Sequence, residues 1–341
     1  MKPIFLAINL CSSLTAVVAY DYVIVGGGTG GLTVAGRLTE DPNVSVAVIE
    51  AGPNAEDLPE VFIPGLIGTG QSFTTLNWAY PTVPQKNLNG RAVTVNAGKA
   101  LGGSTIINSM IFVRTIIEQY DVWGEVNNDT EWTWNALLPY FKKSEIATPP
   151  NPFQVQIGGV RFDPSVHGFN GNVKVGFPNF YFIQSELWRN ASVSLGFPRS
   201  PDLANGNPHA VGVAPNSLDA KNNTRCSAAC AYYTPVASRP NLAVFLNATA
   251  TRIIWANNTK AGKIIASGVE FLQGGQTTVI SVEREVVLSA GTIGTPKVLE
   301  LSGVGNSTIL SAAGVKTVLA LPTVGENLIG KYTFSSYAAY H

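Results

Sequence analysis

Apolar residues recur along this chain with two different spacings, and each spacing predicts a kind of element. A short run of β-branched and aromatic residues at 21–25 predicts a buried strand. Apolar residues then recur at helical spacing over 29–39, and a second apolar run at 44–49 predicts another strand. The chain after residue 20 therefore begins as a strand–helix–strand unit, which is typical of an α/β fold.

Weaker versions of both patterns continue toward the C-terminus. Helices are predicted over residues 118–125, 133–144, 185–195 and a short stretch ending at 302, and strands over 173–175, 243–246, 252–255, 268–272, 277–282 and 285–288. Between residues 149 and 207 the chain is rich in Pro, Gly, Asn and Phe. This composition favours a second, loop-rich domain inserted into the first.

The turn between the first strand and the first helix is rich in glycine. Gly26, Gly28 and Gly31 form G-x-G-x-x-G, and Glu50 ends the second strand 19 residues after the last glycine (50 − 31). In this context the glycines allow a tight turn, close approach of a pyrophosphate and close helix packing, while the acid can bind a ribose. The motif predicts a bound dinucleotide, either NAD or FAD. The alternative is a turn that binds nothing.

Two later segments offer backbone to the same ligand. Residues 98–108, GKALGGSTIIN, form a loop of paired glycines and hydroxyls that can approach a planar or phosphate-bearing ligand closely. The strand at 285–288 runs into Ser289-Ala290-Gly291. Small residues between a strand and a helix give a second place where a dinucleotide can touch the main chain.

The N-terminal residues are expected to direct secretion. Lys2 precedes an apolar run at 4–18, and small residues follow, which is typical of a signal peptide over residues 1–19. The alternatives are a membrane anchor or a buried first strand, but the run is short for a membrane span. Seven N-x-S/T sequons suit a secreted glycoprotein carrying N-linked glycans: Asn43, Asn128, Asn190, Asn222, Asn247, Asn257 and Asn306.

Charge and cysteine content exclude several other classes. The formal net charge is zero and only 13% of residues are charged, so no basic surface for nucleic acid is expected. Cys226 and Cys230 have C-x-x-x-C spacing without a neighbouring histidine, which is not a zinc site, and no metal site is predicted. If one helix carried both, a disulfide between them would be strained, so two unpaired buried thiols are expected.

Three blocks in the same order resemble the glucose–methanol–choline (GMC) oxidoreductases, which are FAD enzymes. They are the G-x-G-x-x-G unit, GKALGGSTIIN and SAGTIGTPKVLELSGVG, supported by EWTWNALLPYFKKSE, RPNLAVF and LPTVGENL. The similarity spans almost all of residues 20–328 and is greatest to fungal secreted glucose dehydrogenase, glucose oxidase and aryl-alcohol oxidase relatives. It implies FAD rather than NAD.

The resemblance also implies roles for individual positions. The pyrophosphate would be held by Gly26, Gly28, Thr29, Gly30 and Gly31, and the ribose by Glu50. Trp78 would lie near the adenosine, with Ala250 and Ala290 contacting the cofactor through their backbone. The residues expected around the flavin and diphosphate are Leu101, Gly102, Gly103, Ser104, Asn108, Ser109, Met110 and Ile111. For Asn108 the alternative is a turn residue that bonds its own backbone.

The resemblance has two consequences for chemistry. Some relatives attach the flavin through a histidine just before the position of Asn108, and Ile107 stands there, so FAD is predicted to bind without a covalent bond. The family's catalytic histidine and its partner lie in a part that this chain does not match. His167 and His209 lie in Pro- and Gly-rich stretches and are expected to be surface or turn residues, and His341 matches no motif, so no catalytic residue is assigned.

The expected fold is α/β, with a Rossmann-like FAD-binding domain built on a mostly parallel sheet and part of an α+β substrate domain, the C-terminal part of the family fold being absent. The expected boundaries are a signal peptide at 1–19, the FAD-binding domain at 20–150 and 221–330, the partial substrate domain at 151–220 and a non-family tail at 331–341.

The predicted function is FAD-dependent oxidation of a CH–OH group on a small sugar or alcohol by a secreted protein. No nucleic acid or membrane partner is expected, and the sequence leaves the oligomeric state open. Two alternatives remain: a catalytically inert, secreted FAD-binding glycoprotein or truncated product, and an NAD-dependent Rossmann dehydrogenase.

Overall fold

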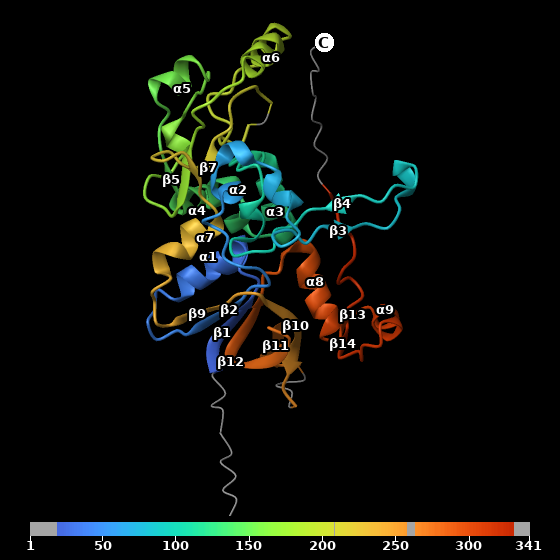
Figure 1. The fold of residues 1–341 in the computed structure, drawn as a ribbon. Helices are drawn as coiled ribbons and strands as arrows, with labels where there is room; N and C mark the ends of the chain where they lie inside the picture. The colour runs from blue at the N-terminus through green and yellow to red at the C-terminus, as the bar shows by residue number, and fades with distance from the viewer. Residues whose placement is uncertain (1–18, 208, 258–262, 331–341) are drawn as a thin grey trace, which may run out of the picture.

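The computed structural model describes residues 19–207, 209–257 and 263–330. A larger sheet lies at one end of the molecule and a smaller sheet toward the other, with helices packed between them (Figure 1). The proposed signal peptide, His341 and the tail at 331–341 lie outside the described residues, apart from residue 19. The expectation of an α/β fold with a parallel-dominated main sheet is confirmed.

The main sheet has the order β10-β11-β12-β1-β2-β9. Its strands are β1 (Ala19–Val25), β2 (Val46–Ile49), β9 (Leu242–Phe245), β10 (Ala248–Trp255), β11 (Ala266–Gln273) and β12 (Gln276–Leu288). The pairs from β12 through β1 and β2 to β9 are parallel, whereas β10, β11 and β12 form antiparallel neighbours. Three of the five neighbouring pairs are therefore parallel. The order places β1 in the middle of the sheet, where it is covered on both faces.

The two strands expected at 277–282 and 285–288 are one strand, β12. The polar residues between them mark a bulge, because the register opposite β1 shifts between Tyr20 and Tyr22. At the bulge, Nε of Arg284 lies 2.9 Å from Oδ1 of Asp21. The break in the apolar pattern therefore reflects a local irregularity and not a turn.

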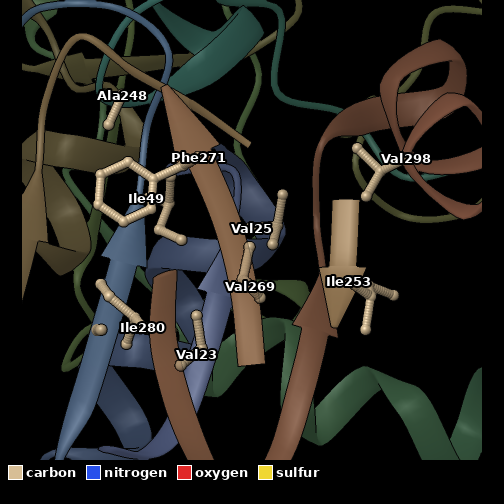
Figure 2. Packing of buried hydrophobic residues seen from close by; sticks show 10 residues of the cluster. Val23, Val25, Ile49, Ala248, Ile253, Val269, Phe271, Ile280 and Val298 are labelled. Atoms are coloured by element: carbon tan, nitrogen blue, oxygen red, sulfur yellow. The ribbon is translucent and has the colours of Figure 1, made fainter. Parts of the chain in front are cut away.

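Strand β1 sends alternate side chains into two cores because successive residues of a strand point to opposite faces. Val23 and Val25 join a core with Phe271 of β11 and Val298, part of which Figure 2 shows. Ile24 joins a second core beneath helix α1 (Thr29–Leu38). Burial on both faces explains why residues 23–25 of β1 and all of β2 form continuous apolar runs and do not alternate with polar residues.

The smaller sheet has the order β5-β6-β7-β8. It contains β5 (Glu145–Ala147), β6 (Val173–Gly176), β7 (Asn216–Asp219) and β8 (Thr224–Arg225). Only β5 and β6 are parallel neighbours. Two further pairs are short: β3 (Tyr80–Pro81) with β4 (Thr94–Val95), and β13 (Val304–Gly305) with β14 (Leu319–Ala320).

The other helices match the apolar periodicity where they are long. They are α2 (Pro59–Phe62), α3 (Ile117–Asn127), α4 (Trp134–Ser144), α5 (Pro152–Gln156), α6 (Ile183–Ser194), α7 (Ala228–Tyr232), α8 (Gly291–Leu301) and α9 (Ser307–Ala312). Short 3-10 turns are η1 (Pro64–Leu66), η2 (Thr69–Ser72), η3 (Lys86–Leu88), η4 (Gly103–Ile106), η5 (Thr130–Trp132), η6 (Pro164–Val166) and η7 (Thr234–Val236). The predictions of α3, α4 and α6 are confirmed to within two residues at each end.

Candidate cofactor site

Three strands of the main sheet end at one edge. Because β1, β2 and β12 are parallel, their carboxyl ends lie together, which is where open α/β sheets bind ligands. Gly26 N donates to Ile49 O at 2.8 Å, and Ser289 N donates to Val25 O at 2.8 Å. These bonds carry the sheet pairing one residue past β1 and β12 and bring the two strand-to-helix turns side by side.

The first turn can be built only with glycine at two positions. Gly26 has φ +98°, and a Cβ there would lie 2.5 Å from Ser289 O. A Cβ on Gly31 would lie 2.0 Å from Gly26 O, so α1 packs against the turn only because this side chain is missing. Gly28 is the N-cap of α1 and no side chain caps this N-terminus. The first N–H groups of α1 are therefore left for a ligand.

The GGS loop at 102–104 packs directly on this turn. Gly102 N donates to Gly27 O at 2.8 Å, and a Cβ on Gly103 would lie 2.7 Å from Gly28 Cα. Gly102 and Gly103 both have positive φ, which glycine adopts without strain. The two glycine segments, which are 75 residues apart in sequence (103 − 28), are therefore close enough to contact one molecule.

A cavity of about 270 Å³ opens at this edge of the sheet. The predicted cofactor residues that line it are Gly26, Gly28, Thr29, Gly30, Glu50, Trp78, Gly103, Ser104, Ala250 and Ala290. They come from the first turn, the end of β2, the segment before β3, the GGS loop, β10 and the turn after β12. We refer to this space as the cofactor pocket.

The other predicted positions do not line the cofactor pocket. Gly31, Leu101 and Gly102 brace its wall: the side chain of Leu101 would lie 3.0 Å from a Cβ on Gly27. Asn108, Ser109, Met110 and Ile111 follow the loop toward the smaller sheet, where Met110 O accepts Ser217 N at 2.8 Å and Ile111 bridges to Asn216.

Asn108 has the geometry of a turn residue. Its Oδ1 accepts the backbone N–H of Met110 at 3.0 Å, and it also accepts Nη1 of Arg225 at 2.8 Å. The side chain thus holds its own loop and anchors a buried arginine. Asn108 ends the loop at residues 98–108, which we call the cofactor loop, and both of these bonds are internal to the protein.

Glu50 is a buried acid held by the main chain. Its Oε2 accepts Gly27 N at 2.8 Å, and its Oε1 accepts Gly52 N at 2.9 Å. Burial raises the pKa of Glu50 to about 7, although the N–H groups of Gly52 and Gly27 and the charge of Lys99 act in the opposite direction. A donor that reaches this carboxylate from the pocket, such as a ribose hydroxyl, would favour the ionised form.

The sequence reasoning missed part of the pocket wall. Helix α8 contributes Gly294, Lys297, Val298 and Leu301, whose spacing of three or four residues places them on one helix face. That periodicity was a readable signal within the SAGTIGTPKVLELSGVG block. Tyr80 was also missed; its ring stacks on Trp78 with centroids 5.8 Å apart, and Lys99 Nζ lies 4.9 Å from the Trp78 ring centroid.

The expectation that His167 is a surface or turn residue is wrong. The residue is 1% exposed, with Nδ1 lying 3.1 Å from Oε1 of Glu145 and Nε2 lying 3.0 Å from Oδ2 of Asp202. Phe162 stacks on the ring at 4.7 Å. His167 directly follows η6 and points inward because the buried carboxylates of Glu145 and Asp202, which are distant in sequence, face its imidazole. His209, by contrast, is exposed and lies in a turn as expected.

Arg114, Glu145, His167 and Asp202 form what we call the buried ion chain. Arg114 Nη2 donates to the same Oε1 of Glu145 at 2.9 Å. Both ring nitrogens of His167 face carboxylate oxygens, so the protonated ring can donate on each side. Burial alone would lower the pKa of His167, but the hydrogen bonds to Asp202 and Glu145 outweigh it and raise the pKa to about 9. None of the four residues lines the cofactor pocket.

Within 19–207, 209–257 and 263–330, no cluster of three or more His, Cys, Asp or Glu side chains could hold a metal ion. In the same ranges, every helix is too short or too polar to cross a bilayer.

Known proteins resemble this chain over nearly its whole length. A glucose oxidase-like protein of Humicola fuscoatra is 40% identical, over 96% of this chain and 56% of its own length. Pyranose dehydrogenase 3 of Leucoagaricus meleagris is 36% identical, over 91% of this chain and 51% of its own. The solved structure of an FAD-dependent oxidoreductase from Chaetomium thermophilum superposes with a TM-score of 0.82 at 36% identity, covering 89% of this chain and 51% of that one.

The chain thus spans about half the length of the relatives it matches. The sequence profile described as GMC oxidoreductase matches residues 20–333, which includes both glycine segments and the turn after β12. This chain therefore belongs to the GMC oxidoreductase family.

Proposed function

We propose that this chain binds FAD without a covalent bond and forms the cofactor-binding part of an oxidoreductase that acts on CH–OH groups of a small sugar or alcohol. The observation that supports this most strongly is the backbone contact between Gly28 and Gly103, which joins two motif segments into one pocket wall. The substrate class follows from relatives named as a glucose oxidase-like protein and a pyranose dehydrogenase.

The pocket suits a dinucleotide because most of the residues that line it are small and leave the backbone accessible. A Cβ built on Gly28 would meet only Gly103 Cα, at 3.6 Å, so the space in front of Gly28 is open. The free N–H groups of α1 would hold the pyrophosphate there, and Glu50 would accept the ribose hydroxyls. Trp78 and Tyr80 offer aromatic surface to the adenosine.

Ile107 supports non-covalent binding. It is 5% exposed and packs in a small apolar core with Leu76 and Ile106. An aliphatic side chain cannot form a bond to a flavin. The loop that carries it would therefore hold the cofactor by shape and hydrogen bonds alone.

When bound, FAD supplies the acceptor for a hydride removed from the substrate. The residues of this chain bind and orient the cofactor, and α8 with its Lys297 closes one side of the pocket. No histidine of the described ranges lies in the pocket wall, so we assign no proton acceptor to this chain.

We further propose that the protein is secreted and glycosylated, with residues 1–19 as the signal peptide. Six sequon asparagines are exposed and available to a glycosyltransferase: Asn43, Asn128, Asn190, Asn222, Asn247 and Asn257. Asn306 instead caps α9 by accepting Thr308 N at 3.0 Å, so it is the least suited of the seven.

The cofactor is tested by denaturing the purified chain and recording the absorbance of the released small molecule. A flavin spectrum, with none remaining on the precipitated protein, is expected. Flavin that stays with the protein would contradict non-covalent binding. A folded, colourless protein that binds NAD would instead identify an NAD-dependent dehydrogenase. A chain that binds FAD but gives no turnover when it is fused to the remaining part of a relative would identify an inert flavoprotein.

The proposed site is tested by Gly28→Ala. The new methyl group fits beside Gly103 but occupies the space in front of the α1 N-terminus, so FAD content should fall at least tenfold while the fold is kept. Gly65→Ala is the matched control, because a Cβ on Gly65 meets nothing within 4 Å and this residue lies outside the pocket wall. Equal FAD content in the two variants would contradict the site.

A further inference from the structure

Cys226 and Cys230 lie against each other beside the cofactor loop. Their Sγ atoms are 2.7 Å apart. A disulfide bond is about 2.05 Å long, so little movement separates this contact from a bond. Cys226 is 2% exposed, and Cys230 is partly exposed at a cavity that Lys174 and Glu56 also line.

The two cysteines do not share one helix, which was the condition for a strained bond, because only Cys230 belongs to α7. Ser227 is the N-cap of α7 and has extended backbone, with φ −74° and ψ 174°. Cys226 precedes it and continues from β8, its N–H donating to Ser217 O at 2.9 Å. The two cysteines therefore approach from different directions and not as neighbours along one helix.

We propose that Cys226 and Cys230 are a redox pair that closes to a disulfide. The bond would fix residues 225–228, which hold the cofactor loop. The residues that hold this loop lie on either side of Cys226. Ala228 N donates to Thr105 Oγ1 at 2.8 Å, and Arg225 Nη1 donates to Thr105 O at 3.0 Å. Closing the bond restrains the turn that carries Ala228 and fixes Cys226, the residue that follows Arg225.

The order of reaction follows from exposure and charge. The contact with Cys226 lowers the pKa of Cys230, with the charge of Lys174 acting in the same direction, while the contact with Cys230 and burial raise the pKa of Cys226. The Cys230 thiolate attacks one sulfur of a small-molecule disulfide, such as oxidised glutathione, and releases one glutathione thiolate. Cys226 then loses its proton and attacks Sγ of Cys230, which expels the second glutathione. The pair loses two electrons and two protons, and the small disulfide gains both.

The bond is tested on the full chain equilibrated with mixtures of reduced and oxidised glutathione, quenched, alkylated and cleaved with trypsin. Both cysteines fall in one peptide, residues 226–252. Bacterial expression keeps Asn247 in this peptide free of glycan. In the oxidised mixtures we expect this peptide to be two hydrogen masses lighter and unalkylated. Two alkylated cysteines at every ratio would overturn the proposal.

Single variants test the order of attack. In Cys226→Ser, Cys230 should carry a stable glutathione adduct because its resolving partner is missing. In Cys230→Ser, Cys226 is buried and should stay unmodified under the same conditions. The opposite pattern would overturn the assignment of Cys230 as the attacking thiol. Both variants are nearly isosteric, and circular dichroism checks that they fold.

The coupling to the loop is tested by amide hydrogen exchange at residues 102–108. The oxidised chain should exchange there several-fold more slowly than the reduced chain, and the midpoint of thermal unfolding should rise by about 2–6 °C. The double variant Cys226→Ser with Cys230→Ser should show neither difference. Identical exchange in the oxidised and reduced wild type would show that the bond has only a local effect and would overturn this part of the proposal.

Discussion

The cofactor pocket and the buried ion chain differ in the kind of residue that forms them. Most residues that line the pocket are Gly, Ala, Ser or Thr, and Glu50 is an acid buried in its wall. The ion chain is made of side chains, and its four ionisable groups are each at most 5% exposed at the side chain. The cofactor pocket leaves a cavity for a ligand, whereas the interior of the buried ion chain is filled by its own charged side chains.

The difference shows which kinds of site a sequence reveals. A backbone site needs glycine where a Cβ would collide, as at Gly26 and Gly31, and so leaves a fixed local spacing. A side-chain site needs only complementary partners, which can come from any part of the chain. Each residue of the ion chain looks ordinary in its own segment, because its partners lie at least 22 residues away.

The largest effect expected from breaking the ion chain is that of His167→Ala. Removing the imidazole leaves Glu145 and Asp202 buried without their shared partner, which should lower the free energy of unfolding by about 3–5 kcal/mol. Urea unfolding followed by circular dichroism measures it. His209→Ala is the control, since that ring is exposed, and should change stability by less than about 0.5 kcal/mol. Similar values for the two variants would show that the chain of ions has no role in stability.

The next effect is a dependence on alkaline pH. The pKa of His167 is about 9 in the folded protein, above its ordinary value of 6.5, so its stabilising contribution is complete below pH 6.5 and is lost as pH rises through 9. The loss should reach roughly 3 kcal/mol. Unfolding of the wild type and His167→Ala should be compared from pH 6 to pH 9.5, and parallel curves would contradict the assignment.

Glu50 should also make the free energy of unfolding fall as pH rises. The fall should occur at lower pH than the one caused by His167 and should be no larger. Its pKa is raised from 4.5 to about 7, so the folded protein binds more protons than the unfolded chain between these values. Stability should therefore fall as pH rises from 4.5 through 7, by up to about 3 kcal/mol. Glu50→Gln should remove this slope in the cofactor-free protein. A slope that persists in the variant would assign it to another group.

The smallest expected change in stability comes from a substitution in the cofactor pocket. Gly28→Ala should change the free energy of unfolding by no more than about 1 kcal/mol, because φ is −88° and the nearest atom to the new Cβ is at 3.6 Å, which leaves only the lower preference for alanine at an N-cap. Thermal unfolding of the cofactor-free variant measures it. A loss of several kcal/mol would show that the open space in front of Gly28 is needed for folding itself.

Much of the fold was readable because its signals are local. The strand, glycine turn and helix at the start of the chain follow from apolar spacing and from positions where only glycine fits. The long helices α3, α4 and α6 were readable for the same reason. Residues of the pocket could be named where a motif marks them, as at Glu50 and Gly103.

The rest depended on contacts between distant segments. The bulge in β12 follows from its pairing with β1, and polar residues at that point look the same as a turn in the sequence. The inward turn of His167 follows from Asp202, 35 residues later. The approach of Cys226 to Cys230 depends on Ser227 being extended, which periodicity does not reveal.

Strand β12 links the turn that follows it at the cofactor edge to the hairpin that it forms with β11. Its first half pairs with β11, its second half pairs with β1, and Ser281 pairs with both neighbours. A slip of one residue at the hairpin would turn Ile280 out of the core and displace Ser289 from Gly26 in the same movement. The alignment of the ligand-facing turns thus depends in part on this hairpin, and an insertion into it should reduce cofactor binding before it unfolds the sheet.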